Sequence, residues 1–294
     1  MIADHETNVV YVADTLERKY PGVHRQLASI LREHAIPMRV IPGTVDVWCR
    51  DYFPVQVAEN RFVQFRYEPD YLTGKNHHLR ADGEIGLTLP WLKECRRSKI
   101  VLDGGNVVGW GGRAIVTEKV FRGNPGLSRK AVTDGLKWEL GLSELIFVPR
   151  EPFDPIGHSD GMVCWLSEQT VLINDYSTVS GSFRHRIHWS LGRHQIDLVE
   201  LPYEPQAGGR DGIPTAAGNW MNFLRVRNLL IVPVFGMKGD ERVLGILREV
   251  HPGYGVEAVE CRKLAEEGGL LHCVTWQAGC PDRGDGTGGW LHRS

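Results

Sequence analysis

The chain has 294 residues and a formal net charge of −2, with acidic and basic residues mixed along it. This balance lacks the basic patch expected of a protein that binds nucleic acid or an anionic membrane surface. No apolar run approaches the roughly 20 residues that a membrane-spanning helix needs, and residues 1–6 carry acids where a secretory signal would be basic and then apolar. We therefore expect a cytoplasmic globular protein.

Short β-branched or apolar runs predict strands along the whole chain. They occupy residues 9–12, 38–41, 62–65, 100–102, 114–116, 145–148, 162–165, 170–173 and 229–232. Amphipathic stretches predict helices, most clearly at residues 21–34, 127–140 and 240–250. The order strand, strand, helix, strand repeats at intervals of roughly 50 to 60 residues, which indicates a fold built of repeated modules. The pattern indicates one α/β domain over residues 1–294, built of similar modules.

A doubly wound parallel sheet is the alternative α/β architecture. The first predicted strand is not followed by the G-x-G-x-x-G pattern that such a sheet uses for a dinucleotide. The glycine-rich residues 279–289 predict a loop or a mobile end rather than a further module.

The six cysteines are scattered and include no C-x-x-C pair, which disfavours a zinc site of the ribbon type. A disulfide framework is not expected in a chain of this length from a reducing compartment. His77 and His78 are adjacent but have no third or fourth ligand close in sequence. We predict no metal site, and we expect most of the thiols to be inert core groups.

Cys273 is the candidate nucleophile. Attack on carbon requires a thiolate, so the site must lower the pKa of the thiol with positive charge or hydrogen-bond donors, and a bound cation can supply that charge. Gly268 and Gly269 precede it and allow the backbone to approach a ligand closely. The alternative is a buried, unreactive cysteine.

His158 and Asp160 lie between two glycines, just before the predicted strand at residues 162–165. Residues two apart at the start of a strand face the same side, so both side chains can enter one pocket. One can move a proton while the other binds a cationic group. The alternative is a turn in which the aspartate caps its own backbone.

His272 stands beside Cys273 in the sequence. If that segment is a strand, the two side chains face opposite sides. We therefore expect His158, rather than His272, to be the proton-transfer partner of the thiol.

Further candidates for substrate binding are Trp48, Asp103, Asn106 and Gly269. Asp51 follows Trp48 closely, and a carboxylate beside an aromatic ring suits a planar guanidinium through paired hydrogen bonds and cation–π contact. An Arg50–Asp51 surface pair is the alternative. Asp103 and Asn106 flank two glycines after a predicted strand, where they either face a ligand or form an ordinary turn.

Seven sequence blocks occur in an order that resembles a known family. They are residues 48–54, 102–106, 157–161, 174–177, 219–223, 232–236 and 268–273. Together they resemble the agmatine deiminase and bacterial-type peptidylarginine deiminase family, within the guanidine-modifying superfamily. The resemblance extends from about Val9 to Gln277, so it covers nearly the whole chain.

The resemblance implies the pentein fold, a five-bladed α/β propeller of ββαβ modules with the active site on its axis. It implies that Cys273 is the nucleophile and His158 the general acid and base, and that Asp51 and Asp160 hold the guanidinium nitrogens. It implies no metal and no organic cofactor. The substrate would be a small guanidinium such as agmatine, giving N-carbamoylputrescine and ammonia, or an arginine side chain.

Three positions depart from the family pattern. Asp103 stands where glutamate is usual, Leu270 where asparagine is usual, and Trp220 where tyrosine is usual. The first two changes would alter the pocket around the tail of the substrate. Glu68 and Asp70 would attract an amine tail, or lie in a solvated loop.

Other functions use similar residues. A Cys–His amidase or protease is disfavoured, because papain-like enzymes place the cysteine before the histidine and the caspase block is absent. An amidinotransferase or a dimethylarginine-type hydrolase would share the residues and differ in the leaving group. A protein that only binds guanidinium would be expected to have lost a catalytic group. The edge strands of a propeller would also permit a homodimer.

Overall fold

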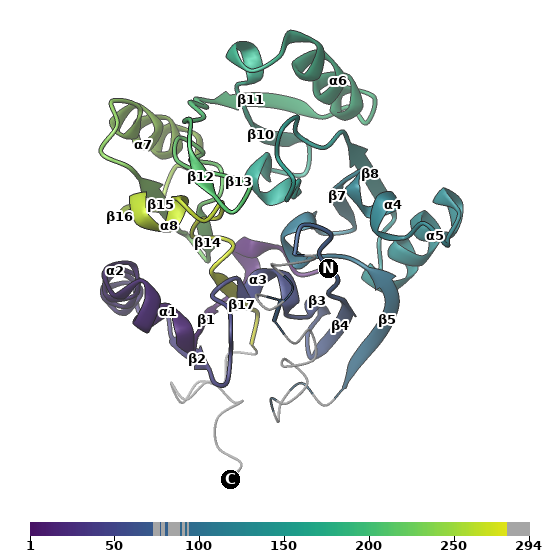
Figure 1. Cartoon of the computed structure of the whole chain (residues 1–294), viewed down its shortest axis with the longest axis horizontal. Helices are drawn as coiled ribbons and strands as arrows, with labels where there is room; N and C mark the ends of the chain where they lie inside the picture. The colour runs from purple at the N-terminus through teal and green to yellow at the C-terminus, as the bar shows by residue number, and fades with distance from the viewer. Residues whose placement is uncertain (73–76, 78–79, 82–88, 90–91, 93, 281–294) are drawn as a thin grey trace.

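The computed structural model describes residues 1–72, 77, 80, 81, 89, 92 and 94–280. Within these ranges, five three-stranded sheets are arranged around a central axis, together with one two-stranded hairpin (Figure 1). The five sheets are the blades of the predicted α/β propeller. No helix of the described residues is long and apolar enough to cross a membrane.

Each blade takes three strands, and the chain visits the blades in order. The first blade contains β1 (Val9–Ala13), β2 (Met38–Ile41) and β17 (Thr275–Ala278), and the second contains β3 (Val55–Ala58), β4 (Arg61–Arg66) and β5 (Cys95–Val101). The third contains β6 (Val108–Trp110), β7 (Arg113–Thr117) and β8 (Glu144–Val148). The fourth contains β9 (Val163–Trp165), β10 (Thr170–Asn174) and β11 (Asp197–Leu201), and the fifth β14 (Leu224–Val226), β15 (Leu229–Val234) and β16 (Gly255–Glu260).

One pairing pattern recurs in all five blades. The middle strand pairs antiparallel with one neighbour and parallel with the strand that follows it, as β7 does with β6 and β8. The antiparallel neighbour is the preceding strand in four blades, and in the first blade it is β17, from the other end of the described chain. A parallel pair needs a crossover connection, usually a helix. Helices supply it in four blades, and in the second blade the crossover falls mostly on residues outside the described ranges. The predicted strand–strand–helix–strand module is therefore confirmed.

Helices cover the outer faces of the blades (Figure 1). The crossover helices are α1 (Asp14–Lys19) and α2 (Pro21–Glu33), α4 (Lys119–Gly123) and α5 (Arg129–Leu140), α6 (Gly181–Gly192) and α7 (Gly239–Val250). The predicted helices at residues 21–34, 127–140 and 240–250 correspond to α2, α5 and α7. α2 begins with Pro21, which suits the first helical position, and buries Val23, Leu27 and Leu31 on one face.

Local capping sets the ends of α5. The Ser128 side chain accepts a hydrogen bond from the amide of Ala131, so the helix begins two residues later than the apolar pattern predicted. Gly141 follows the helix with a φ of +67°, the left-handed conformation common after a last turn.

The two ends of the described chain meet in the first blade. β17 pairs antiparallel with β1, with Val9 opposite Ala278. This pairing closes the ring of blades and brings the segment before β17, which includes Cys273, to the axis. The predicted loop at residues 279–289 lies mainly outside the described residues, as does His78.

Candidate active site

Short segments that link one blade to the next converge at the axis. These segments include α3 (Cys49–Tyr52), η5 (Gly104–Asn106), η6 (Ser159–Gly161) and the turn at residues 271–274 before β17. They carry Asp51, Asp103, the pair His158 and Asp160, and Cys273. The propeller therefore brings together residues that are as much as 222 positions apart, from Asp51 to Cys273.

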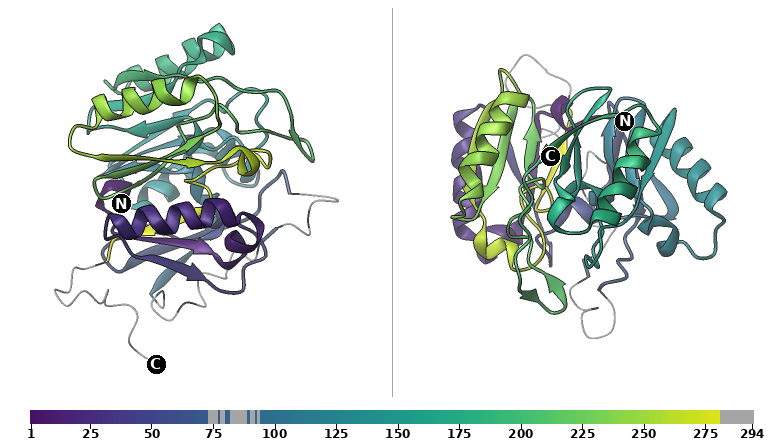
Figure 2. Two further views of the ribbon diagram at one scale, coloured as in Figure 1. Left: turned by 90° about the vertical axis from the view of Figure 1, so that its left-hand side faces the viewer. Right: turned by 90° about the horizontal axis from the view of Figure 1, so that it is seen from above.

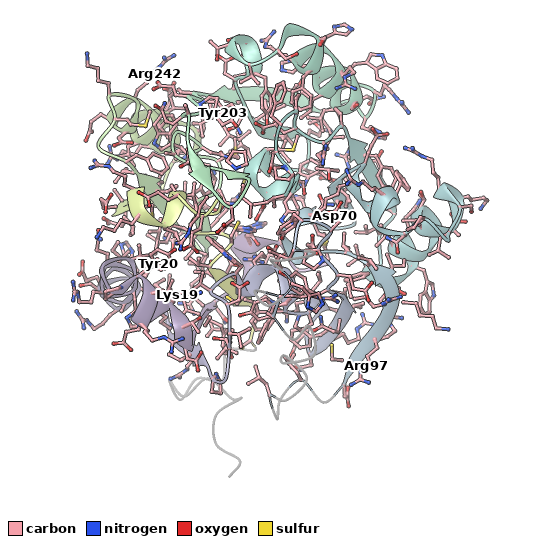
Figure 3. The ribbon with its side chains drawn as sticks, in the orientation of Figure 1. Lys19, Tyr20, Asp70, Arg97, Tyr203 and Arg242 are labelled. Atoms are coloured by element: carbon pink, nitrogen blue, oxygen red, sulfur yellow. The ribbon has the colours of Figure 1, made fainter. Side chains whose placement is uncertain are left out.

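These segments border a cavity of about 1000 Å³. Six of the eight predicted site residues line it, namely Cys273, His158, Asp160, Asp51, Trp48 and Gly269. Asp103 and Asn106 lie behind this layer and contact it. The outer part of the cavity includes Lys19 and Tyr20 from the end of α1 (Figure 3) and the hairpin of β12 (Gly209–Arg210) and β13 (Ile213–Pro214).

The Cys273 thiol faces a carboxylate. Its Sγ lies 3.7 Å from Asp160 Oδ2, and its backbone amide donates a hydrogen bond to Asn222 Oδ1 at 3.3 Å. Burial raises the pKa of the thiol well above its usual range, and the negative charges of Asp160 and Asp51 raise it further. Without a cation in the cavity, the thiol is therefore protonated near neutral pH.

His158 lies between two carboxylates. Its Nε2 is 2.8 Å from Asp103 Oδ2, and its Nδ1 is 3.4 Å from Asp51 Oδ1. Nδ1 makes no hydrogen bond with any described residue. Burial alone would lower the pKa of His158, but the charges of Asp51 and Asp103 outweigh it and raise the pKa.

Asp103 contacts the imidazole rather than the cavity. Its Oδ2 accepts hydrogen bonds from His158 and, at 2.8 Å, from Lys119 Nζ. Burial would raise the pKa of this carboxyl, but Lys119 and His158 together hold it well below its usual range. Asp103, predicted to bind substrate, is therefore positioned to orient the histidine.

Asn106 ties the end of a strand to the turn that follows His158. Its Oδ1 accepts hydrogen bonds from the backbone amides of Thr117, at 3.0 Å, and Ser159, at 3.2 Å. The first of these amides ends β7 and the second follows His158. Asn106 therefore fixes the turn that carries His158 against the neighbouring blade, and its side chain is not part of the cavity lining.

Gly105 sits where three polar groups converge. A Cβ there would lie 2.7 Å from Asp51 Oδ1, 2.9 Å from His158 Nδ1 and 3.0 Å from Asp160 Oδ2. The Gly105 amide also donates to Asp51 Oδ1 at 3.0 Å. Burial, with the charges of Asp103 and Asp160, raises the pKa of Asp51 to about 6. Only a residue without a side chain fits at this point.

His272 belongs to the site, although the sequence pattern favoured an orientation away from it. Residues 271–274 form a turn instead of a strand. His272 Nδ1 lies 2.7 Å from Asp160 Oδ2, and Nε2 lies 3.1 Å from Asp4 Oδ2 in η1 (Asp4–Glu6). His272 therefore contacts the same carboxylate as the Cys273 thiol. The signal available in the sequence was the adjacency of His272 to Cys273. The expectation of a strand in this segment, where the structure has a turn, concealed it.

The contact between His272 and Asp160 shifts the pKa values of the two partners in opposite directions. Burial would raise the pKa of Asp160, but the hydrogen bond and charge of His272 lower it. Burial and the charge of Arg50 would lower the pKa of His272, whereas Asp4 and Asp160 raise it. The contact thus favours the protonated form of His272 and the ionised form of Asp160.

Trp48 and Gly269 pack against each other in the cavity wall. A Cβ on Gly269 would lie 2.4 Å from Cζ3 of the Trp48 ring. The glycine therefore lets the indole approach the backbone next to Cys273. Of the departures from the family pattern, Leu270 lines the cavity, while Trp220 is buried elsewhere and donates its indole N–H to Asp240 at 2.9 Å.

Two other acids do not reach the cavity. Glu68 pairs with Arg66, and Asp70 pairs with Arg122 at 3.1 Å and lies 3.8 Å from Lys119 Nζ. Neither lines the cavity. Asp46 does line it, and burial raises the pKa of this carboxyl to about 7. No group of three or more metal-ligating side chains occurs in the part of the chain that the structure describes.

The chain matches a family model described as Porphyromonas-type peptidyl-arginine deiminase over residues 1–279. The agmatine deiminase of Stutzerimonas stutzeri is 28% identical over 278 residues, covering 80% of this chain and 75% of that protein. The solved agmatine deiminase of Enterococcus faecalis is 17% identical, covers 95% of each chain and has a TM-score of 0.77. A dimethylarginine dimethylaminohydrolase structure is 14% identical, covers 92% of this chain and 100% of its own, and has a TM-score of 0.55.

The structural likenesses establish that the five blades form a pentein propeller. The family match covers far more than half of the chain and includes every site residue described above. The chain therefore belongs to the Porphyromonas-type peptidyl-arginine deiminase family.

Proposed function

We propose that this protein is a deiminase that hydrolyses agmatine to N-carbamoylputrescine and ammonia through a covalent cysteine intermediate. The observation that carries the proposal is the grouping of one thiol, one imidazole with an unbonded nitrogen and two carboxylates in a single cavity. A cationic guanidinium is the electrophile that these groups suit, because the acids attract it and the thiol attacks it.

Asp51 and Asp160 would hold the guanidinium. Both carboxylates are buried and both come within 3.0 Å of the point above Gly105. Planar guanidinium groups form strong paired hydrogen bonds with carboxylates, and the face of Trp48 adds a cation–π contact. Because the acids are fixed before the substrate arrives, their charges are already arranged for the reaction.

The bound cation would also activate the nucleophile. The carboxylates that raise the pKa of Cys273 are neutralised when a guanidinium binds between them. The substrate thus lowers the pKa of the thiol that attacks it. The free protein keeps the thiol protonated and less reactive.

The chemistry would proceed in two halves. Once the guanidinium is bound, the Cys273 thiol loses its proton to solvent and the thiolate adds to the guanidinium carbon. His158 gives a proton to a nitrogen, and the carbon–nitrogen bond breaks as ammonia leaves. A water then gives a proton to His158 and adds to the thiouronium carbon. The carbon–sulfur bond breaks, and the ureido product and the thiolate are released. Nδ1 is the nitrogen available for both transfers, because Nε2 is held by Asp103.

The choice of agmatine rests on the curated relatives, of which the Stutzerimonas stutzeri protein carries that name. Deimination of a peptidyl or free arginine is the second candidate. The cavity of about 1000 Å³ is larger than a small guanidine requires and supports that alternative, as does the family description. Pockets for drug-sized ligands span about 300–1000 Å³.

The decisive experiment measures ammonia and ureido product from agmatine, arginine, methylarginine and an arginine-containing peptide. Turnover of one substrate by the natural protein, with loss in Cys273→Ala and retained binding, is expected. Release of an alkylamine in place of ammonia would indicate a dimethylarginine-type hydrolase. If none of these substrates is turned over but a guanidinium still binds, a protein that only binds guanidinium would be favoured instead.

The proposal includes one catalytic domain over residues 1–294, located in the cytoplasm. Closure of the first blade by β17 supports a single unit, since a cut through the chain would open the ring. The proposal also includes a homodimer formed through blade edges, which sedimentation equilibrium would test.

A further inference from the structure

A lysine lies behind the imidazole of His158. Lys119 is the first residue of α4, and its side chain is only 9% exposed. Its Nζ lies 2.8 Å from Asp103 Oδ2 and 3.4 Å from His158 Nε2. Burying a lysine beside a histidine is unfavourable unless the charge is compensated. Asp103 supplies that compensation.

The effect of Lys119 on the ring depends on the protonation state of His158. The imidazolium donates from Nε2 to Asp103. In the neutral ring that has released its proton from Nδ1, Nε2 keeps its own proton and its hydrogen bond to Asp103, and the Lys119 ammonium 3.4 Å away no longer faces a cation. Lys119 therefore repels the imidazolium but not the neutral ring.

The other charges around His158 act in the opposite direction. Asp51 approaches from α3, Asp103 from the segment before η5, and Asp160 from η6 on the histidine's own segment. The rings of Tyr71 and His158 meet in an edge-type arrangement with their centroids 6.3 Å apart, and the Cys273 thiol shares the cavity. Among the described residues packed around the ring, three carboxylates favour the imidazolium and Lys119 opposes them.

Lys119 is held firmly in this place. Its Nζ lies 4.7 Å from the centre of the Tyr71 ring and 3.8 Å from Asp70 Oδ1, and Asp70 is labelled in Figure 3. Lys119 is not part of the cavity lining. Its effect on a substrate would therefore pass through His158 and Asp103.

We propose that Lys119 is a positioning residue that keeps His158 able to release its proton, because its ammonium group beside Nε2 disfavours the imidazolium. The inference rests on the proposed function, in which His158 acts first as an acid and then as a base. Without the lysine, the surrounding carboxylates would keep the ring protonated at higher pH, and the hydrolytic half of the reaction would slow.

The first test measures the titration of His158 by NMR in protein with labelled histidines, using Cys273→Ala to exclude turnover. We expect Lys119→Met to raise the pKa of His158 by about one unit, because a nearby like charge is removed. Lys119→Arg, which keeps the charge, should leave it near the natural value. Lys130→Met is the control, since Lys130 lies on the surface of α5 with 84% of its side chain exposed.

The second test is the pH dependence of kcat with the substrate found above. Lys119→Met should shift the profile to higher pH by about one unit and lower kcat about tenfold at the natural optimum. A merely structural lysine would lower activity without moving the profile. If Lys119→Met does not fold, Lys119→Gln removes the charge while keeping a hydrogen-bond donor for Asp103.

An unchanged His158 titration in a folded, uncharged variant would overturn the inference. The titration does not depend on turnover, so a protein without deiminase activity would refute the proposed function alone. A shifted titration with an unshifted kinetic profile would overturn the link between Lys119 and catalysis.

Discussion

Two buried histidines sit on either side of the reactive carboxylates, and they differ in one respect. His272 has both ring nitrogens within hydrogen-bond distance of carboxylates, at 2.7 Å from Asp160 and 3.1 Å from Asp4. His158 makes one hydrogen bond, at 2.8 Å to Asp103, and its Nδ1 lies 3.4 Å from Asp51 Oδ1 without a hydrogen bond to any described residue. Acidic neighbours raise the pKa of both.

In the proposed reaction, this difference would separate a histidine that holds a carboxylate from one that carries a proton. A ring saturated by two carboxylates has no nitrogen left for a substrate, so His272 suits the task of holding Asp160. A ring with one unbonded nitrogen can exchange a proton with a ligand. His158 alone of the two also has a lysine in contact, which eases loss of its proton.

The Asp4 end of the His272 contacts lies on the face of the propeller opposite the hairpin that borders the cavity. Asp4 lies in the N-terminal segment, whereas β12 and β13, which border the cavity, project on the opposite face (Figure 2). A smaller polar cavity of about 50 Å³ borders Asp4 and His272. Asp160 is therefore supported from the face opposite this hairpin.

The largest expected effect separates the two histidines directly. His158→Asn should lower kcat by about 10² to 10⁴-fold, the range of a lost general acid and base, with little change in ligand binding. Steady-state kinetics and calorimetry with agmatine would measure both. Substantial activity in this variant would mean that His272 transfers the proton, and the comparison would be wrong.

Gly105 lies beside the contacts of both histidines. Gly105→Ala would place a methyl group against Asp51, His158 and Asp160, and displacing them should lower kcat/KM about 100-fold, as about 1 Å of misplacement can. Gly126→Ala is the matched control, because no atom lies within 4 Å of a Cβ there. Equal activity of Gly105→Ala and Gly126→Ala would show that the site tolerates displacement of these three side chains.

His272→Asn tests the holding function. Loss of His272 beside Asp160 should weaken the binding of the guanidinium by Asp160. KM should then rise about tenfold with a smaller change in kcat, as expected when an interaction made equally in the ground state and the transition state is lost. The kinetics should be compared with those of His158→Asn. A loss confined to kcat would assign His272 to the chemical step.

The smallest effect is expected at Asp4, the carboxylate that contacts the other ring nitrogen of His272. Asp4→Asn should lower the free energy of unfolding by about 1 kcal/mol at pH 7, a modest value because the Asp4 side chain is 35% exposed. Chemical denaturation at several pH values would measure it.

The pH dependence of that effect has a definite sign. His272 lowers the pKa of Asp4 to about 2 in the folded protein, although burial opposes the change. The stabilisation is therefore present above the pKa of the unfolded chain and is lost as the pH falls through about 2. The difference in the free energy of unfolding between Asp4→Asn and the natural protein should disappear in that range. A difference that does not change with pH would contradict the ion pair.

Several features of the site follow from residue type and order alone. Periodicity and turn residues predicted the strands and main helices, and their repetition indicated the modules. Cys273, His158, Asp160 and Asp51 were identified by chemistry and by family resemblance, and the structure brings them into one cavity. Trp48 and Gly269 also line it. These assignments were accessible because nucleophiles, glycines and aromatic groups are uncommon and occur in recognisable blocks.

Contacts between blades were decided only by the tertiary structure. Lys119 follows an ordinary strand, and nothing in its neighbours indicates that α4 directs it toward Asp103 and His158. His272 was misplaced because a strand and a turn orient adjacent side chains differently. Asp103 looked like a ligand contact until its partner was known.

The sequence by itself determined the kind of module, the order of the blades and the chemical identity of the reactive groups, because local propensity and residue chemistry are properties of short segments. The tertiary structure decided which carboxylate faces which histidine, and which ring nitrogen stays unbonded. Those pairings depend on distances between segments up to 268 residues apart, from Asp4 to His272. Only closure of the propeller fixes such distances.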